Sequence, residues 1–295
     1  MPDSYSSEIK RSQRHLDAAP GPAPFFMDTP RGPMFAIHHR AAGHVRGNVL
    51  CVPPFNEEMN RCRSMITLQA RALATQGIGT LLLDPHGTGD SAGSFVDGRW
   101  SHWHDDLRIG VEWLMQQPGG CRGFWGIRLG AILAAEAMAL LAPNDRALIL
   151  WQPVLDGKQH LTQFLRVRLA AQMDRPDLPK ETTSSMRAQF AAGQSVEIGG
   201  YEIHPELAAA IDGARLASAL PSGSHNILWV EQPPPGAAEL GAGTLALVQA
   251  WRDRGLTCNV ATFDGPSFWQ LYERVLAQGA IEATTSWAGT LWKNA

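Results

Sequence analysis

The segment Gly126-Ile127-Arg128-Leu129-Gly130 follows an apolar stretch and precedes a helix-like run from Ala131 to Met138. Its two glycines have the G-x-S-x-G spacing of a nucleophile elbow, a sharp strand-to-helix turn that normally presents a serine. The central residue here is Arg128, whose protonated guanidinium has no lone pair with which to attack a carbonyl. The sequence therefore has the frame of the turn, while the residue that should perform the chemistry is absent.

The composition is that of a chain with a large core and no polyanionic or membrane partner. The chain has 295 residues, enough for one main α/β domain, and a formal net charge of -3. Nucleic-acid binding usually needs a strong basic excess, and no apolar run is long enough for a membrane span. Residues 1–22 lack the apolar core of a signal peptide, so we expect a flexible N-terminal segment and a cytoplasmic protein.

The cysteines and histidines do not form a disulfide or metal-binding pattern. Four cysteines are scattered without C-x-x-C spacing, which is typical of reduced, packed thiols: Cys51, Cys62, Cys121 and Cys258. Cys62 lies near a predicted helix start, which can lower a thiol pKa, but packing is the simpler interpretation. His102 and His104 precede two aspartates without the spacing of a metal site. We expect no metal and no cofactor.

Short apolar segments alternate with helical stretches along the chain. Pro24–Met27 and Pro33–His39 flank a turn-rich spacer and predict an antiparallel pair. Six further segments predict buried parallel strands: Asn48–Val52, Thr80–Asp84, Gly123–Gly126, Ala147–Trp151, Asn226–Glu231 and Cys258–Phe263. Helices are expected at Cys62–Thr75, Trp103–Gln116, Leu129–Leu141, Thr244–Arg254 and Phe268–Ala277. This alternation predicts an α/β fold, a mostly parallel sheet flanked by helices.

One connection is far longer than an ordinary crossover. About 70 residues separate the strand that ends near Val154 from the one that starts near Asn226. We expect the excess to form a helical cap, residues 156–223, inserted after the sixth strand of a core made of 23–155 and 224–295. Such a cap lies where parallel sheets enclose their ligands, beyond the carboxyl ends of the strands.

These patterns resemble the α/β-hydrolase fold over nearly the whole chain. Asp84–Ser91 is similar to the D-x-x-G-x-G-x-S turn that commonly follows the fourth strand of this fold. Three segments resemble more narrowly the exosortase A system-associated hydrolases of the second type: Val52–Asn60, Gly126–Ala131 and Trp151–Val154. The resemblance implies a bacterial, capped α/β-hydrolase that works with exosortase and exopolysaccharide genes.

The Ser-His-acid triad of that fold is incomplete in this sequence. Arg128 occupies the nucleophile position, and Pro266 or Ser267 stands where the histidine should follow the last strand. Glu231, at the end of the strand that often supplies the acid, is a candidate vestige of that acid, and Asp156 is a weaker one. We therefore expect a degenerate triad and no standard serine-hydrolase mechanism.

Arg128 needs a partner, because an unpaired guanidinium in a covered site is costly. Glu57 and Glu58 follow the third strand, on the loop that faces the elbow, and are its natural partners. One interpretation is that the ion pair simply closes the site. Another is a noncanonical ester or thioester hydrolase in which Glu57 or Glu58 activates water and Arg128 stabilises the oxyanion.

The leading interpretation is a binding site for a small acyl or anionic ligand. Arg128, the Phe55 amide and the helix N-terminus at Leu129 would hold an anionic group. Trp269 would supply an apolar wall for an acyl chain, although a core role is the simpler one for this residue. A third alternative is a scaffold whose cap binds a protein partner encoded in the exosortase and exopolysaccharide cluster.

Overall fold

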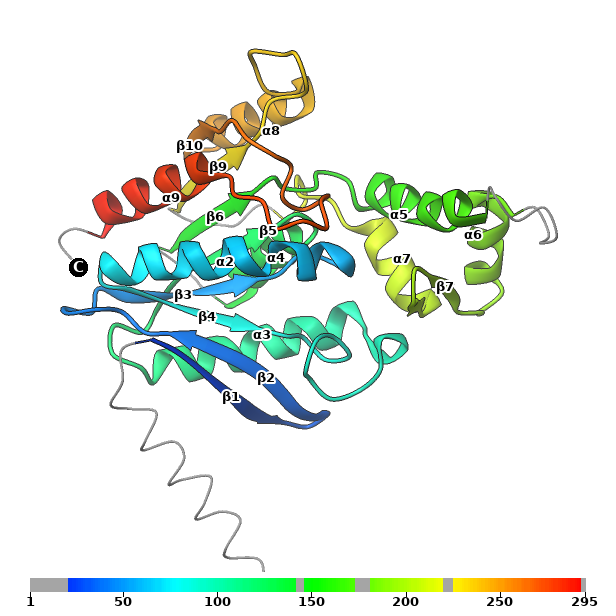
Figure 1. Ribbon diagram of the computed structural model, residues 1–295, viewed down its shortest axis with the longest axis horizontal. Helices are drawn as coiled ribbons and strands as arrows, with labels where there is room; N and C mark the ends of the chain where they lie inside the picture. Colours follow the sequence, from blue (N-terminus) through cyan, green and yellow to red (C-terminus); the bar gives the residue numbers. More distant parts are fainter. Residues whose placement is uncertain (1–20, 142–145, 173–180, 220–224, 293–295) are drawn as a thin grey trace, which may run out of the picture.

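The computed structural model describes residues 21–141, 146–172, 181–219 and 225–292; the predicted flexible segment, residues 1–22, lies almost entirely outside them. An eight-stranded sheet forms the centre of the protein in the order β1-β2-β4-β3-β5-β6-β9-β10 (Figure 1). Its strands are β1 (Pro22–Thr29), β2 (Gly32–His39), β3 (Gly47–Val52), β4 (Ile78–Leu83), β5 (Cys121–Ile127), β6 (Ala147–Trp151), β9 (Asn226–Glu231) and β10 (Thr257–Thr262). The β1–β2 and β2–β4 pairs are antiparallel and the other pairs are parallel.

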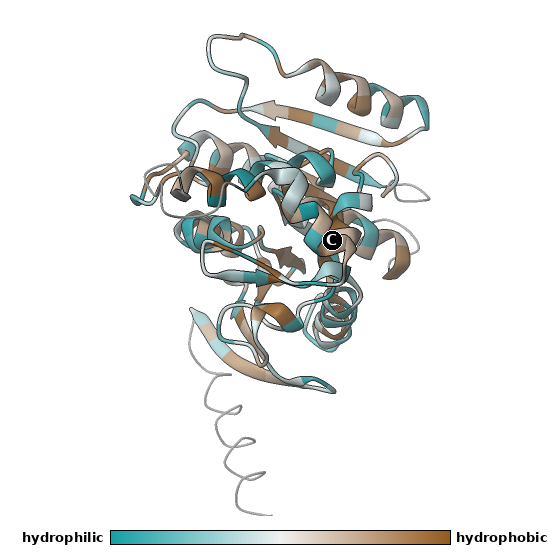
Figure 2. Ribbon diagram, turned by 90° about the vertical axis from the view of Figure 1, so that its right-hand side faces the viewer, coloured by the Kyte–Doolittle hydropathy of each residue, from teal (hydrophilic) through white to brown (hydrophobic). Residues whose placement is uncertain are grey.

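The central strands are buried on both faces, which explains their continuous apolar sequences. Every residue of β3, β4 and β6 is buried. Helices α3 (Trp100–Met115), α4 (Gly130–Leu141) and α8 (Ala242–Asp253) cover one face of the sheet, and α2 (Glu57–Thr75) and α9 (Gln278–Leu291) cover the other. In Figure 2 the helices alternate between hydrophobic and hydrophilic ribbon, as expected of helices with one face against a sheet. The predicted mostly parallel sheet flanked by helices is confirmed.

A long insertion separates β6 from β9. It contains α5 (Gly157–Gln172), α6 (Thr183–Ala191), the hairpin β7 (Val196–Ile198) and β8 (Tyr201–Ile203), and α7 (Pro205–Gly213). The insertion projects on the right of Figure 1, beyond the body of the sheet. It lies within the range 156–223 that the sequence assigns to a cap.

Two helix predictions differ from the structure. The helix expected from Cys62 begins at Glu57, so Glu57 and Glu58 form its acidic first turn, which the helix dipole favours. The helix expected over 268–277 does not form, because Phe268 and Trp269 turn into the core while Tyr272 stays exposed. The last helix, α9, instead follows this segment.

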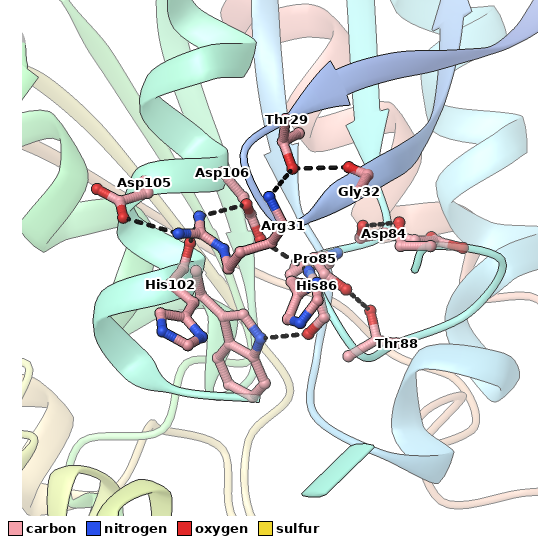
Figure 3. Close-up of polar contacts among 12 residues, drawn as sticks. Thr29, Arg31, Gly32, Asp84, Pro85, His86, Thr88, His102, Asp105 and Asp106 are labelled. Atoms are coloured by element: carbon pink, nitrogen blue, oxygen red, sulfur yellow. Dashed lines mark hydrogen bonds and ion pairs between the residues drawn. The ribbon is translucent and has the colours of Figure 1, made fainter. Parts of the chain in front are cut away.

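A buried carboxylate ties the β1–β2 turn to the loop after β4 and to α3 (Figure 3). Arg31 donates from Nη2 to Asp106 Oδ1 at 3.0 Å and from Nη1 to Asp105 Oδ2 at 3.1 Å. The other oxygen of Asp106 accepts the His86 amide at 2.7 Å. Trp103 Nε1 donates to the His86 carbonyl at 3.0 Å. These bonds, here called the Asp106 clasp, fix the loop that follows β4.

The Asp106 clasp should matter far more for stability than its exposed neighbour. The Asp106 side chain is 1% exposed and that of Asp105 is 51% exposed, although both bind Arg31. Asp106→Asn weakens the buried pair and leaves a polar group poorly matched, so we expect a loss of about 2–4 kcal/mol in the free energy of unfolding. Asp105→Asn should cost less than about 1 kcal/mol. Urea titration of both variants measures the difference, and equal losses would contradict the account.

Candidate functional site

Arg128 sits at a true strand-to-helix turn. Its φ of 55° places it in the left-handed region, between the end of β5 and the start of α4. The Arg128 amide donates to the Trp151 carbonyl at 3.0 Å, and the Arg128 carbonyl accepts from Ala131 and Val154, each at 3.1 Å. The turn therefore has its own backbone support and needs no serine to form.

The two glycines of the motif are required by close packing. A Cβ on Gly126 would lie 2.5 Å from Ala131 Cα, and one on Gly130 would lie 2.3 Å from the Pro53 carbonyl oxygen. The first contact lets α4 pack on β5, and the second brings the elbow against the loop after β3. The G-x-x-x-G frame is thus explained by packing alone.

The side chain of Arg128 is fully engaged. Nε and Nη2 each donate to Glu58 Oε1 at 3.1 Å, and Nη1 donates to the Gln152 carbonyl at 3.2 Å. The Arg128 and Glu58 side chains are only 14% and 19% exposed. The guanidinium also lies 5.3 Å from the ring centre of Trp269. A forked, partly buried pair of this kind neutralises the charge that the arginine would otherwise present.

Glu57 is held by a residue of the insertion. Tyr201, on β8, donates its hydroxyl to Glu57 Oε1 at 2.8 Å. Burial raises the pKa of Tyr201 to about 12, and the adjacent Glu57 carboxylate adds to that rise. The two glutamates that the sequence offers to Arg128 therefore have different partners, and Glu58 is the one paired with the arginine.

A neutral side chain stands where a histidine would be expected, and the acid candidate is bonded elsewhere. After β10, Ser267 donates its hydroxyl to Gln232 Oε1 at 2.9 Å, and Gln232 follows directly on β9. Glu231, one residue earlier, accepts instead from Trp229 Nε1 at 2.6 Å and from Thr244 at 3.0 Å. Burial raises the pKa of Glu231. This places the Glu231 carboxylate against α8 and not against Ser267.

Backbone strain concentrates at the same edge of the sheet. Asn56, Arg128 and Gln152 have φ angles of 54°, 55° and 42°, and they are the non-glycine residues with positive φ in the described ranges. They follow β3, β5 and β6, which are neighbours in the sheet. Positive φ is costly for such residues and gathers at functional sites. The edge has the backbone character of a site even though its nucleophile position holds arginine.

His160 was not found from the sequence. It lies on α5 in the insertion, is 8% exposed, and has its ring 6.2 Å from that of Phe55. Burial lowers the pKa of His160 from its ordinary value of 6.5 to about 4; nearby Glu58 opposes this and Arg128 reinforces it. The insertion thus places a neutral imidazole close to the Arg128–Glu58 pair.

A cavity of about 570 Å³ lies beside the elbow. Phe55 and Leu129 line it, whereas Arg128, Glu58 and Trp269 are not among its lining residues. Its other walls come from the end of β3 and the segment after it, the start of α2, the turn after β4, the short helix Phe95–Asp97, α3, the start of α4 and the β7–β8 turn. The residues are Val52, Pro53, Pro54, Asn56, Met59, Asn60, Arg63, Pro85, Gly87, Thr88, Gly89, Asp90, Phe95, Trp100, Trp103, Gly130, Leu133, Gly200 and Tyr201. The cavity is at the carboxyl ends of β3, β4 and β5, where sheets of this kind bind ligands.

The remaining candidates have structural partners. Cys62 is fully buried, and burial raises its thiol pKa. Asp156 accepts from the Gln159 amide at 3.0 Å and pairs with Arg215 at 3.3 Å. His104 contacts Glu136 at 2.9 Å. Among the residues that the structure describes, no group of three or more His, Cys, Asp or Glu side chains is arranged to hold a metal ion.

The signal that would have located the cavity is the helical spacing of Asn56, Met59, Asn60 and Arg63. It was missed because the helix was expected to start at Cys62 rather than Glu57.

Within the described ranges, none of the helices is long and apolar enough to cross a membrane.

The solved structures most like this protein include esterases and a lipase. Est1E from Butyrivibrio proteoclasticus, solved with ferulic acid, has a TM-score of 0.57 and 13% identity, covering 90% of this chain and 96% of its own. A highly thermostable carboxyl esterase from Bacillus coagulans, in complex with glycerol, has a TM-score of 0.60 and 13% identity, covering 92% of this chain and 99% of its own. A soluble variant of monoglyceride lipase from Saccharomyces cerevisiae, in complex with a substrate analogue, has a TM-score of 0.60 and 11% identity, covering 93% of this chain and 97% of its own. At such identities the likeness shows the fold alone.

A family model supplies the closer relationship. No curated protein matches the chain significantly. Residues 43–198, more than half of the chain, match the model described as serine aminopeptidase, S33. The matched range runs from before β3 to the end of β7 and includes the elbow. The chain therefore belongs to the serine aminopeptidase S33 family and has the α/β-hydrolase fold.

Proposed function

We propose that this protein binds a small, mainly apolar ligand in the cavity beside the elbow and does not hydrolyse esters by a Ser-His-acid mechanism. The observation that carries the proposal is the Arg128–Glu58 pair, in which Arg128 Nε and Nη2 both donate to one carboxylate. The pair fills the nucleophile position with a neutralised arginine. The cavity next to it remains free of both side chains.

Three positions support the proposal of a degenerate triad. Arg128 has no nucleophilic lone pair, Ser267 stands where the base would be needed and bonds to the neutral Gln232, and the carboxylate of Glu231 is held by Trp229 and Thr244. A neutral hydroxyl–amide pair cannot take up a proton at neutral pH as histidine does. Losing all three functions together leaves this site without acyl-transfer chemistry of the standard kind.

The cavity suits an acyl or aryl ligand better than one held by Arg128. Its volume lies within the range of small-molecule sites, roughly 300–1,000 Å³. Phe55 is central to its apolar lining, with ring centres 5.6 Å from Phe95 and 6.1 Å from Trp103. The backbone amides of Phe55 and Leu129 have no acceptor within the described part of the chain. An apolar ligand with one carbonyl oxygen would use all of these groups.

The alternative is a noncanonical hydrolase that uses Glu57 or Glu58 as base. Its support is the proximity of Glu58 and Arg128 to His160. Against it, Glu58 already accepts from Arg128 and Glu57 from Tyr201. A histidine with a pKa of about 4 is also a weak base near neutral pH.

The biological setting remains part of this proposal. The segments Val52–Asn60, Gly126–Ala131 and Trp151–Val154 support a protein of the exosortase A-associated type, acting in the cytoplasm of a bacterium. A scaffold role, in which the insertion binds a partner protein, is the third alternative. It predicts a partner that remains bound when the cavity is filled.

The first prediction is that the purified protein turns over no ester and binds an apolar probe. Wild type should not hydrolyse 4-nitrophenyl esters from acetate to decanoate above the buffer rate, because the elbow holds Arg128 in place of a nucleophile. Leu133→Trp fills the cavity and should abolish binding of butylbenzene, measured by isothermal titration calorimetry. Leu140→Trp on the same helix is the control, since Leu140 is 72% exposed and should leave binding unchanged.

Turnover by wild type that disappears in Glu58→Gln would replace this proposal with the hydrolase alternative. Butylbenzene binding that survives Leu133→Trp would show that the probe occupies another place. In both cases the melting temperature of the variant confirms that it is folded.

The second prediction concerns acid stability. His160 is neutral in the native state down to about pH 4 but takes up a proton near its ordinary pKa of 6.5 when unfolded. The unfolded state therefore binds more protons between these values, and stability falls as the pH is lowered from about 6.5 to about 4. We expect His160→Gln to reduce this loss by about 2–3 kcal/mol. Urea titrations at pH 7 and pH 4.5 test it, with the exposed His44→Gln as control. Equal losses of unfolding free energy between these two pH values in wild type and His160→Gln would refute it.

A further inference from the structure

One face of α2 supplies a polar side to the cavity. Three lining residues share one face of the first turns of α2, Met59, Asn60 and Arg63, and Asn56, the N-cap residue directly before the helix, lines the cavity with them. These four residues are here called the α2 stripe. Three of its four members are polar, so the cavity can form hydrogen bonds with a ligand as well as apolar contacts.

Arg63 offers hydrogen-bond donors without a free charge. Its Nη2 donates to both carboxylate oxygens of Asp84, each at 2.8 Å, and the Asp84 side chain is 1% exposed. Its Nε and Nη1 have no acceptor within the described ranges. Arg128 differs, because all three of its guanidinium nitrogens already donate. Arg63 is therefore the arginine able to bind something in the cavity.

Asn56 lacks partners for both of its side-chain functions. The residue is 6% exposed, and neither Oδ1 nor Nδ2 has a hydrogen-bond partner among the described residues. It is the N-cap residue directly before α2, yet its side chain makes no capping hydrogen bond. A buried amide left this way costs stability unless a partner satisfies it. A carboxylate offers acceptors only, whereas a carboxamide can answer both Nδ2 and Oδ1.

The charges around the cavity do not favour an anion. Asp84 compensates Arg63, and Asp90, another lining residue, adds a negative charge at the turn after β4. An anionic ligand would meet no excess of positive charge. An uncharged ligand is not repelled by the negative charges of Asp84 and Asp90, and it can still accept hydrogen bonds from Arg63.

From the α2 stripe we infer that the cavity selects an uncharged ligand that carries a carboxamide-type group, with Arg63 as a specificity-determining residue. The apolar part of the ligand packs against Phe95, Trp100 and Trp103, which line the cavity from η1 (Phe95–Asp97) and α3. This inference rests on the proposed ligand-binding function and names the ligand class for it.

Three probes of similar size test the selection by isothermal titration calorimetry. They are 3-phenylpropanamide, 3-phenylpropanoate and butylbenzene, which differ in having a carboxamide, a carboxylate or neither. We expect the amide to bind at least about tenfold more tightly than either of the others, because a hydrogen bond to a charged group discriminates by this order.

Two variants and a matched control assign the preference to the stripe. Arg63→Lys keeps a cation against Asp84 but loses Nε and Nη1, so the amide preference should fall to about threefold or less. Asn56→Leu removes the orphaned amide and should lower the preference; because leucine tolerates the positive φ of this position less well than asparagine, its melting temperature is measured to confirm that it is folded. Arg61→Lys is the control: Arg61 lies on the same helix, donates to the Gln270 carbonyl at 2.9 Å, and is not a lining residue.

The outcomes separate the inference from the proposed function. If no probe binds, the ligand-binding function itself fails, and the inference with it. If all three bind equally, the cavity binds ligands but the selection is refuted. Tightest binding of 3-phenylpropanoate would overturn the preference for an uncharged ligand. An amide preference that persists in folded Arg63→Lys would remove Arg63 as its determinant.

Discussion

The ion pair between Arg128 and Glu58 fixes the centre of the strand-to-helix elbow. A strand-to-helix elbow usually presents a nucleophile, but here its central residue points into a forked contact at 3.1 Å and is 14% exposed. The attraction and hydrogen bonds of the pair offset the desolvation cost of the guanidinium, so the elbow can hold arginine without unfolding. The α/β-hydrolase fold is present, and the central residue of its elbow forms an ion pair with the first turn of α2.

The rest of the site adjusts to that contact. With Arg128 paired to Glu58, Ser267 in the loop after β10 donates its hydroxyl to Gln232 and not to an ionised side chain. Glu57, next to Glu58 on the first turn of α2, is held by Tyr201 of the insertion. The cavity lies on the other side of the elbow, toward β4, where apolar walls and the α2 stripe leave room for a ligand.

The sequence predicts the core well and the site less well. Ala147–Trp151 and Asn226–Glu231 are predicted with the bounds they have in the structure, because a buried parallel strand is one continuous apolar run. The start of α2 was placed five residues late, and a helix turns by 100° per residue, so the partners of Glu57 and Glu58 could not be assigned. His160 lies on α5 of the insertion, and only the tertiary packing of the insertion against the core brings it close to the Arg128–Glu58 pair. The local sequence around His160 therefore could not predict its position.

The central claim is tested most directly by a double-mutant cycle on the elbow pair. Arg128→Met, Glu58→Gln and the double variant are compared with wild type by urea unfolding at neutral pH. The account predicts a coupling free energy of about 1–3 kcal/mol, as for residues in direct polar contact. A coupling below about 0.5 kcal/mol would show that the two side chains act independently, and Arg128 would then be available to a ligand or substrate.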